Sequence, residues 1–176
     1  MRIGLCGTMS VGKTTLVNAL KELPEFKDYH FRTERSKHLM NLGIPLNTDS
    51  TLKGQLVFAS ERAAELMQEK IITDRTIVDV MAFCELSKSM NKAEKDNIKN
   101  VLWHLIREYN VIFHIDDLFI PIEDNGVRET NKDYRLSIAI KIQNILEEYP
   151  LTKIVKISGT TEEHINQIKA TLAQYV

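Results

Sequence analysis

The sequence predicts an α/β fold in which helices cover both faces of a doubly wound, five-stranded parallel sheet. Short apolar runs rich in β-branched residues alternate with longer segments in which apolar residues recur every three or four positions. Such alternation is typical of strands joined by helical crossovers. No low-complexity linker and no repeat divides the 176 residues, so we expect residues 1–176 to form a single domain.

Each predicted element follows from one of these two patterns. The five expected strands are residues 2–7, 29–34, 70–74, 110–116 and 152–158. Segments with helical periodicity are residues 14–23, 52–70, 77–90, 94–109 and 162–176. In each of these helices an apolar stripe would pack on the sheet. After the fourth strand the helical period is broken at Pro121, Asn125 and Gly126 and resumes near Asn131, which indicates a turn followed by a further helix.

Composition and charge restrict the class of protein. The chain has 23 Lys and Arg against 24 Asp and Glu, a formal net charge of −1, so we do not expect duplex nucleic acid as a partner. The 2 cysteines, Cys6 and Cys84, match no metal spacing and fit reduced thiols. The apolar stretch near the N-terminus is interrupted by Gly7 and followed by Lys13, and is too short for a signal peptide or membrane span. We therefore predict a cytoplasmic protein with no membrane partner.

The stretch GTMSVGKT, residues 7 to 14, matches the pattern G-x-x-x-x-G-K-[ST] between a predicted strand and a predicted helix. In that setting the motif forms a phosphate-binding loop, or P-loop. Its glycines let successive backbone N–H groups point at phosphate oxygens, and the helix contributes the positive end of its dipole. We predict a nucleoside triphosphate site here. The alternative is a Gly-rich turn that only joins the strand to the helix.

Individual residues of the loop have separate expected roles. Lys13 would reach the β- and γ-phosphates, and the Thr14 hydroxyl would ligate the Mg²⁺ that bridges them. The predicted binding site for ATP and Mg²⁺ comprises Gly7, Ser10, Val11, Gly12, Lys13, Thr14 and Thr15. The loop motif does not distinguish ATP from GTP, and it does not distinguish hydrolysis from phosphoryl transfer.

An acidic residue at a strand end near the loop would help to hold Mg²⁺ or its water, and two candidates are present, Asp74 and Asp116. Asp74 is followed directly by Arg75. A carboxylate and a guanidinium together suit a site where an acceptor meets a transferring phosphoryl group. Alternatively, Asp74 caps the following helix or forms a surface ion pair with Arg75.

Two segments resemble a known family. DRTIVDVMAF resembles the D-R-[ST]-x-x-D stretch of P-loop nucleoside and nucleotide kinases, and PIEDNGVRETNKDYR resembles the lid of their nicotinamide riboside kinase-like, AAA-type subgroup. The resemblance implies a P-loop NTPase fold of the nucleotide-kinase type, with strand order 2-3-1-4-5 and a helical lid at about residues 118–136. It also implies that Asp74 lies beside the acceptor and the metal, and that Arg128 and Arg135 close over the triphosphate.

The lid arginines also have a chemistry of their own. If Arg128 begins the lid helix, Arg128 and Arg135 are about two turns apart and share one helix face. Guanidinium groups brought in by a mobile loop can neutralise charge that develops on a phosphoryl group. The alternative is a solvated charged helix, because Glu129, Lys132 and Asp133 interleave with the arginines.

The carboxyl end of the second strand supplies further acceptor-site candidates. Open α/β sheets bind ligands beyond the carboxyl ends of their strands, so we predict that Glu34, Arg35, Asp74 and Arg75 contact the acceptor. Glu34 could instead cap the helix SKHLMNL or pair with Arg35 in solvent. The loop SGTTEE, after the fifth strand, either contacts the purine or forms a helix capping box at one of its threonines.

We interpret the sequence as a kinase that transfers the γ-phosphoryl group of ATP to a small nucleoside or nucleotide, of the deoxynucleoside monophosphate or nicotinamide riboside type. Its expected catalytic residues are Lys13, Asp74, Arg75 and Arg128, with either Glu34 or Asp74 as the base. Two alternatives stay open: a kinase acting on nucleic-acid ends or modified bases, and a regulatory NTP-binding switch with slow hydrolysis. The sequence does not choose the acceptor, and it leaves a homodimer open.

Overall fold

The structure is a computed structural model, and it describes residues 1–33, 35–122, 130–149 and 153–175. Within these residues, five parallel strands form one sheet in the order β2-β3-β1-β4-β5, which confirms the predicted order. The strands are β1 (Arg2–Cys6), β2 (His30–Arg32), β3 (Ile71–Asp74), β4 (Val111–Ile115) and β5 (Lys153–Ile157). In the register of the sheet, Leu5 lies between Asp74 and Phe113, so the carboxyl ends of the three central strands meet at one edge.

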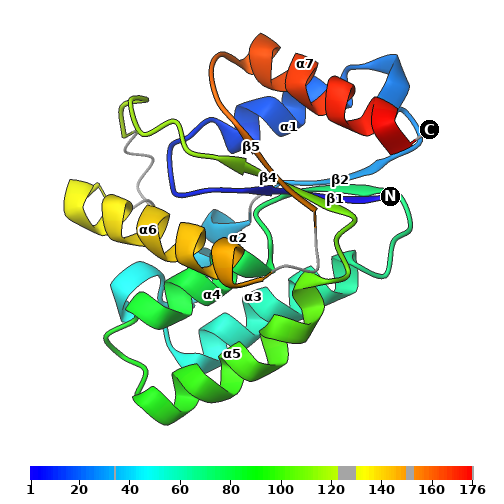
Figure 1. Ribbon diagram of the computed structural model, residues 1–176. Coiled ribbons are helices and arrows are strands. Elements are labelled where there is room, and N and C mark those ends of the chain that lie inside the picture. The colour runs from blue at the N-terminus through cyan, green and yellow to red at the C-terminus, as the bar shows by residue number, and fades with distance from the viewer. Residues whose placement is uncertain (34, 123–129, 150–152, 176) are drawn as a thin grey trace.

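Helices cover both faces of the sheet (Figure 1). On one face lie α1 (Lys13–Lys21) and α7 (Thr161–Leu172). The other face is covered by α3 (Leu52–Glu65), α4 (Ile77–Leu86), α5 (Lys92–Ile106) and α6 (Lys132–Glu148). The short helix α2 (Ser36–Asn41) follows β2, and single 3₁₀ turns occupy Pro24–Phe26, Asn47–Asp49 and Ala173–Tyr175.

Two hydrophobic cores hold these layers together, one on each face of the sheet. Leu16, Val17 and Ile168 belong to the core under α1 and α7, whereas Met81 and Ile142 belong to the core under α3 to α6. The three central strands are buried along almost their whole length, because helices cover both of their faces. The edge strands β2 and β5 keep exposed positions.

Several predicted boundaries extend beyond the observed elements. The strand predicted at 29–34 is only three residues long, because β2 is an edge strand that pairs with β3 alone. The helix predicted at 52–70 ends at Glu65. The next residue, Leu66, is buried, so the apolar period continues past the point where the helical backbone stops. The helix predicted at 77–90 ends at Leu86, and Ser87 has extended geometry.

The helix expected near Asn131 is α6, and the Asn131 side chain caps it by accepting hydrogen bonds from the N–H groups of Asp133 at 2.9 Å and Tyr134 at 3.0 Å. Because this cap fixes the helix start at Lys132, the idea that Arg128 begins the lid helix is wrong. Arg128 itself lies outside the described residues.

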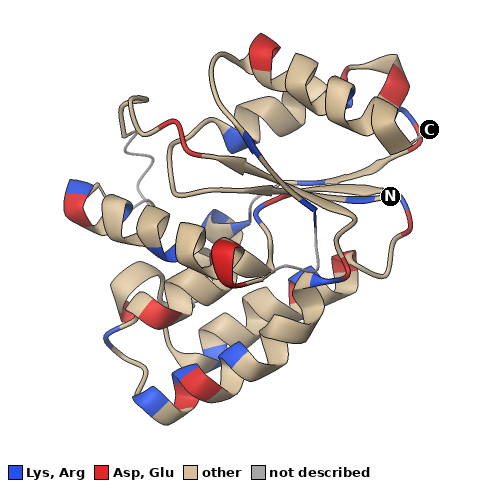
Figure 2. Cartoon of the chain, viewed as in Figure 1, with Lys and Arg blue, Asp and Glu red and all other residues tan. Residues whose placement is uncertain are grey.

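The surface mixes charges of both signs. Figure 2 shows Lys and Arg interspersed with Asp and Glu along the outer helices, and some of them pair, as Lys92 does with Asp96 at 2.7 Å on α5. In the described ranges, the helices are either too short or too polar to cross a membrane.

Candidate active site

The P-loop turns sharply between β1 and α1, and two glycines allow it to do so. Gly7 has φ of +154°, and a Cβ atom there would lie 2.4 Å from the backbone oxygen of Ile115. Gly12 has φ of +84° and is the residue from which α1 begins. Only glycine adopts such conformations readily. The sequence motif therefore specifies the backbone path of the loop as well as its chemistry.

Replacing Gly7 with alanine should destabilise the protein by about 1–3 kcal/mol, because the added methyl group would press the loop away from β4. Denaturant unfolding of both proteins measures this loss. Gly43→Ala is the matched control, since Gly43 also has positive φ, +78°, but a Cβ there meets nothing within 4 Å. Equal losses in the two variants would mean that backbone strain, rather than the contact with Ile115, explains Gly7.

Lys13 is buried, with 5% of its surface exposed, and its side chain lies against the loop. Its Nζ donates hydrogen bonds to the backbone oxygens of Gly7 and Thr8, each at 2.6 Å. Burial lowers the pKa of the Lys13 ammonium, and the nearby Arg75 guanidinium lowers it further. The lysine thus presents a desolvated cation within the loop, which an anionic ligand would stabilise.

Thr14 and Asp74 meet at the mouth of the loop. The Thr14 Oγ1 donates a 2.5 Å hydrogen bond to Oδ2 of Asp74. Asp74 is only 1% exposed, and in the described part of the chain its other oxygen, Oδ1, has no hydrogen-bond partner. The cap of α4 is Thr76, so the alternative that Asp74 caps this helix is wrong, and the burial of Asp74 contradicts the alternative of a surface ion pair.

Arg75 follows Asp74 in a strained backbone conformation, with φ of +78°. Its N–H donates to the backbone oxygen of Leu5 at 3.0 Å. Its guanidinium lies over the ring of Phe83 on α4, 5.2 Å from the ring centroid, which is the geometry of a cation–π contact. The backbone and the aromatic ring together direct the Arg75 side chain along the floor of the site.

Asp79 joins the Asp-Arg turn to the P-loop, a role that sequence reasoning missed. Its Oδ2 accepts hydrogen bonds from the backbone N–H and the hydroxyl of Thr76, at 2.7 and 2.9 Å. Its Oδ1 accepts a 3.3 Å hydrogen bond from the N–H of Gly7. Asp79 is the last residue of the D-R-[ST]-x-x-D stretch, so the motif contained a signal for it.

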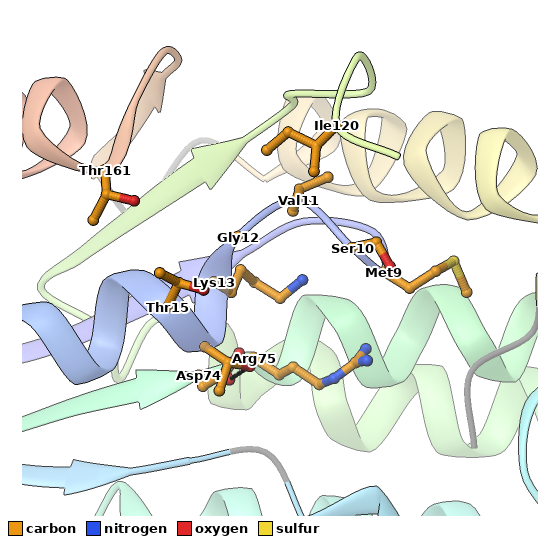
Figure 3. Close-up of a pocket in the computed structure, with 11 residues that line it drawn as sticks. Met9, Ser10, Val11, Gly12, Lys13, Thr15, Asp74, Arg75, Ile120 and Thr161 are labelled. Atoms are coloured by element: carbon orange, nitrogen blue, oxygen red, sulfur yellow. Dashed lines mark hydrogen bonds between the residues drawn. The ribbon is translucent and has the colours of Figure 1, made fainter. Parts of the chain in front are cut away.

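These groups surround a cavity of about 200 Å³ at the carboxyl edge of the sheet. Figure 3 shows Lys13 and Arg75 approaching it from different elements, with Ile120 and Thr161 at its margin. The lining residues are Met9, Ser10, Val11, Gly12, Lys13, Thr14, Thr15, Asp74, Arg75, Ile120 and Thr161. The cavity thus brings together most of the predicted P-loop residues and the predicted Asp-Arg pair, and sequence reasoning had not assigned Met9 or Ile120 to it.

Arg135 lies behind the P-loop, outside the cavity lining. Its Nη1 donates to the backbone oxygen of Ile120 at 2.8 Å, and its Nη2 donates to that of Ser10 at 3.1 Å. The Thr8 hydroxyl donates to the backbone oxygen of Arg135 at 2.9 Å. Arg135 is 6% exposed, and burial lowers its pKa. The alternative of a solvated arginine is therefore wrong for Arg135, which links α6 to the P-loop.

Other predicted residues lie apart from the cavity. Arg35 forms a 2.9 Å ion pair with Glu61 of α3 and does not line the cavity. The second acidic candidate, Asp116, accepts a hydrogen bond from Lys156 at 2.9 Å, so it faces a lysine rather than Thr14. Glu34, like Arg128, falls outside the described residues.

The loop after β5 forms the predicted capping box. The Thr160 hydroxyl accepts from the N–H of Glu163 at 3.3 Å, and Glu163 accepts from the N–H of Thr160 at 2.7 Å. One turn into α7, Nε2 of the buried His164 lies 2.8 Å from Oδ2 of Asp117, which follows β4. These contacts fix the start of α7, where Thr161 reaches the cavity.

Comparisons with known proteins agree with this architecture. Residues 2–164 match the family described as AAA domain, and a search of curated proteins found no significant match. Among solved structures, similar folds include deoxyadenosine kinase from M. mycoides with dCMP and a flexible dCDP bound, at 12% identity, 100% coverage of both chains and a TM-score of 0.66. The dCTP-bound structure of that kinase has 13% identity, 99% coverage of this chain, 100% coverage of that chain and a TM-score of 0.72.

At such low identity these likenesses establish the fold alone. They confirm, at that level, the resemblance to P-loop nucleoside and nucleotide kinases that the sequence indicated. The family match extends from the start of β1 into α7, and so includes the P-loop and every strand of the described sheet. The chain belongs to the AAA domain family and has the fold of a P-loop nucleoside kinase.

Proposed function

We propose that this protein transfers the γ-phosphoryl group of ATP to a small nucleoside or nucleotide. The observation that carries the proposal is the 2.5 Å hydrogen bond between Thr14 of the P-loop and Asp74, with Arg75 next in the chain. This arrangement combines P-loop groups that would bind the phosphates of the donor with a carboxylate and a guanidinium at one strand end. Such a combination suits phosphoryl transfer to an acceptor, whereas a hydrolase has less use for the arginine.

Lys13 and the backbone of the loop would bind the triphosphate. The Lys13 ammonium is held by two backbone oxygens, and it would exchange these partners for β- and γ-phosphate oxygens. The N–H groups at the start of α1 would contact the same phosphates, favoured by the helix dipole. Gly7, Ser10, Val11, Gly12 and Thr15 would complete this binding site, with the two glycines also shaping the loop.

Thr14 and Asp74 fit a Mg²⁺ site. Oδ1 of Asp74 is buried and has no hydrogen-bond partner in the described residues, so a cation would satisfy an otherwise costly oxygen. Mg²⁺ is usually bound through one or two carboxylates together with substrate phosphates, rather than by an all-protein cluster. Bound Mg²⁺ would neutralise charge on the β- and γ-phosphates.

The acceptor would bind beside Asp74 and Arg75. Arg75 would stabilise negative charge as the phosphoryl group moves, and Asp74, if it does not hold the metal, would orient or deprotonate the acceptor hydroxyl. Glu34 remains the other candidate base, and Arg35 remains a candidate contact only if its bond to Glu61 is exchanged. The deoxyadenosine kinase of similar fold supports an acceptor of the deoxynucleoside type, beside the nicotinamide riboside type that the sequence suggested.

Residues 1–176 would act as one kinase domain, in which residues 118–136 serve as a lid. The cavity of about 200 Å³ is smaller than the roughly 300–1,000 Å³ of typical ligand sites. Ile120 borders it and accepts a hydrogen bond from Arg135. We expect this segment to shift when a triphosphate binds, and Arg135 would link the shift to the P-loop.

Arg135→Ala should lower kcat by about 10²-fold and weaken ATP binding much less, because the guanidinium would stabilise charge that appears mainly during transfer. Steady-state kinetics with ATP-binding calorimetry measures the two effects. Arg128→Ala should act in the same direction. The matched control is Lys132→Ala, which removes an exposed cation from the same helix and should leave kcat unchanged. If Arg135→Ala behaves like this control, Arg135 has no role in transfer.

The test of the proposed function is a panel of nucleosides, nucleoside monophosphates and oligonucleotides incubated with γ-labelled ATP. We expect label on a nucleoside or a nucleoside monophosphate, at many turnovers per protein. Label only on oligonucleotides would instead favour a kinase acting on nucleic-acid ends. Slow release of phosphate with no labelled acceptor would favour a regulatory NTP-binding switch.

A further inference from the structure

A buried ion pair lies on α3, behind the Asp-Arg turn and outside the cavity lining. Nη2 of Arg62 lies 2.8 Å from Oε1 of Glu65, one turn later in the helix, and the two side chains are each 4% exposed. Burial raises the pKa of Glu65, and the charge of Arg62 opposes that rise. The two residues form a desolvated pair whose attraction offsets part of the cost of burial.

The other nitrogen of this guanidinium reaches the turn itself. Nη1 of Arg62 donates to the backbone oxygen of Asp74 at 3.1 Å and lies 3.4 Å from that of Arg75. These two carbonyl groups belong to the residue that would hold the metal or the acceptor and to its neighbour. Arg62 therefore connects α3 to the carboxyl end of β3 at the point where the proposed chemistry occurs.

The turn needs such a support because its backbone is strained. Arg75 has φ of +78°, and a left-handed conformation costs a non-glycine residue about 1–2 kcal/mol. A residue stays in such a conformation only where its surroundings hold it there. The N–H of Arg75 is bound to Leu5, and Arg62 holds the carbonyl side of the same turn.

We infer that Arg62 is a positioning residue, which fixes the Asp74 and Arg75 carbonyls so that the Asp74 carboxylate meets Thr14 and the Arg75 guanidinium extends over Phe83. Glu65 holds Arg62 in the orientation that this requires. Arg62 does not line the cavity, so it acts through the turn and not on a ligand. The effect on turnover rests on the proposed kinase function, whereas the effect on the shape of the turn does not.

Stability alone does not account for the pair. Replacing both members of a buried ion pair by apolar side chains of similar volume is often neutral or stabilising, whereas removing one member leaves an uncompensated buried charge. In the described residues, Nε of Arg62 and Oε2 of Glu65 have no hydrogen-bond partner, so the pair is also incompletely satisfied. A positional role and a purely structural role therefore predict different behaviour for a double variant.

The test is the double variant Arg62→Met/Glu65→Leu, which removes both charges and preserves apolar volume. We expect it to fold, with kcat about 10²-fold lower than in the wild type and a much smaller change in KM for ATP, as expected when a reacting group is displaced. Arg62→Lys should recover part of the loss, because its ammonium can reach one carbonyl group but not hold both. The matched control is Lys92→Gln/Asp96→Asn, an exposed pair on α5, which should retain wild-type kcat.

A crystal structure of the double variant supplies a readout that does not depend on turnover. The inference expects the Thr14–Asp74 hydrogen bond to lengthen beyond 3.5 Å or Arg75 to leave positive φ. A folded double variant with an unchanged turn, or with wild-type kcat in an active enzyme, overturns the inference. If the wild type transfers no phosphate to any acceptor, the proposed function fails, and the geometry of the turn in the double variant still decides the role of Arg62.

Discussion

Lys13→Ala should abolish phosphoryl transfer while leaving the fold at least as stable as in the wild type. The ammonium is buried, its pKa is lowered by desolvation, and the charge of Arg75 repels it. Removing it relieves both penalties at the cost of two hydrogen bonds to backbone oxygens and of the attraction to Asp79 and Asp74. In the proposed function the charge of Lys13 would stabilise the bound triphosphate. The substitution should therefore lower turnover and ATP affinity, and it should not lower the melting temperature.

Turnover with the identified acceptor and thermal unfolding should be measured on the same preparations. Lys21→Ala is the matched control, because Lys21 is an exposed lysine at the other end of α1. Undiminished turnover in folded Lys13→Ala protein would contradict the assignment of the P-loop as the donor site. A large loss of stability instead would mean that Lys13 supports the loop through Gly7 and Thr8.

Asp74→Asn should lower kcat by about 10²-fold to 10⁴-fold, the range usual for a carboxylate that acts in the transition state. Asparagine has nearly the same shape and can still accept the hydrogen bond from Thr14, so the change removes charge and little else. Asp74 is almost fully buried with one oxygen unpartnered in the described residues. The variant should therefore unfold at the same temperature as the wild type or at a higher one.

Titration of activity with Mg²⁺ distinguishes the roles left open for Asp74. A rise in the Mg²⁺ concentration needed for half-maximal activity would assign it to the metal. Unchanged Mg²⁺ dependence with low kcat would place it on the acceptor side. The comparison variant is Asp116→Asn, which alters the other strand-end carboxylate, the one that faces Lys156. Wild-type kcat in Asp74→Asn would remove Asp74 from the mechanism.

The fold and the P-loop part of the candidate site could be predicted because their signals are local in sequence. Gly7, Gly12, Lys13 and Thr14 occupy one short stretch whose backbone geometry depends on the glycines themselves. The burial of the central strands appears directly as apolar runs. Asp74 could be assigned from its place at the end of β3, since neighbouring parallel strands end at the same edge.

The rest depended on contacts between segments far apart in the chain. Nothing in the apolar period of residues 52–70 indicates that Arg62 points at the end of β3. The pairing of Arg35 with Glu61 likewise depends on how α2 and α3 approach one another. For Arg135, periodicity predicted the helix on which it lies. It donates to the backbone oxygens of Ser10 and Ile120, and a contact with a backbone oxygen cannot be recognised from the type of residue that supplies it.

Because Lys13 and Arg135 donate hydrogen bonds to backbone carbonyl groups, these carbonyl groups compete with any bound phosphate for the two cationic side chains. Both side chains are already bound to loop or lid carbonyl groups. In the proposed function a triphosphate would have to replace these bonds, and its affinity would be the difference between the two sets of bonds. Diphosphate release would run the exchange backwards, because the vacated cations have internal acceptors within reach. If the loop binds a triphosphate as proposed, it would give up some affinity for the nucleotide in return for faster release of the product.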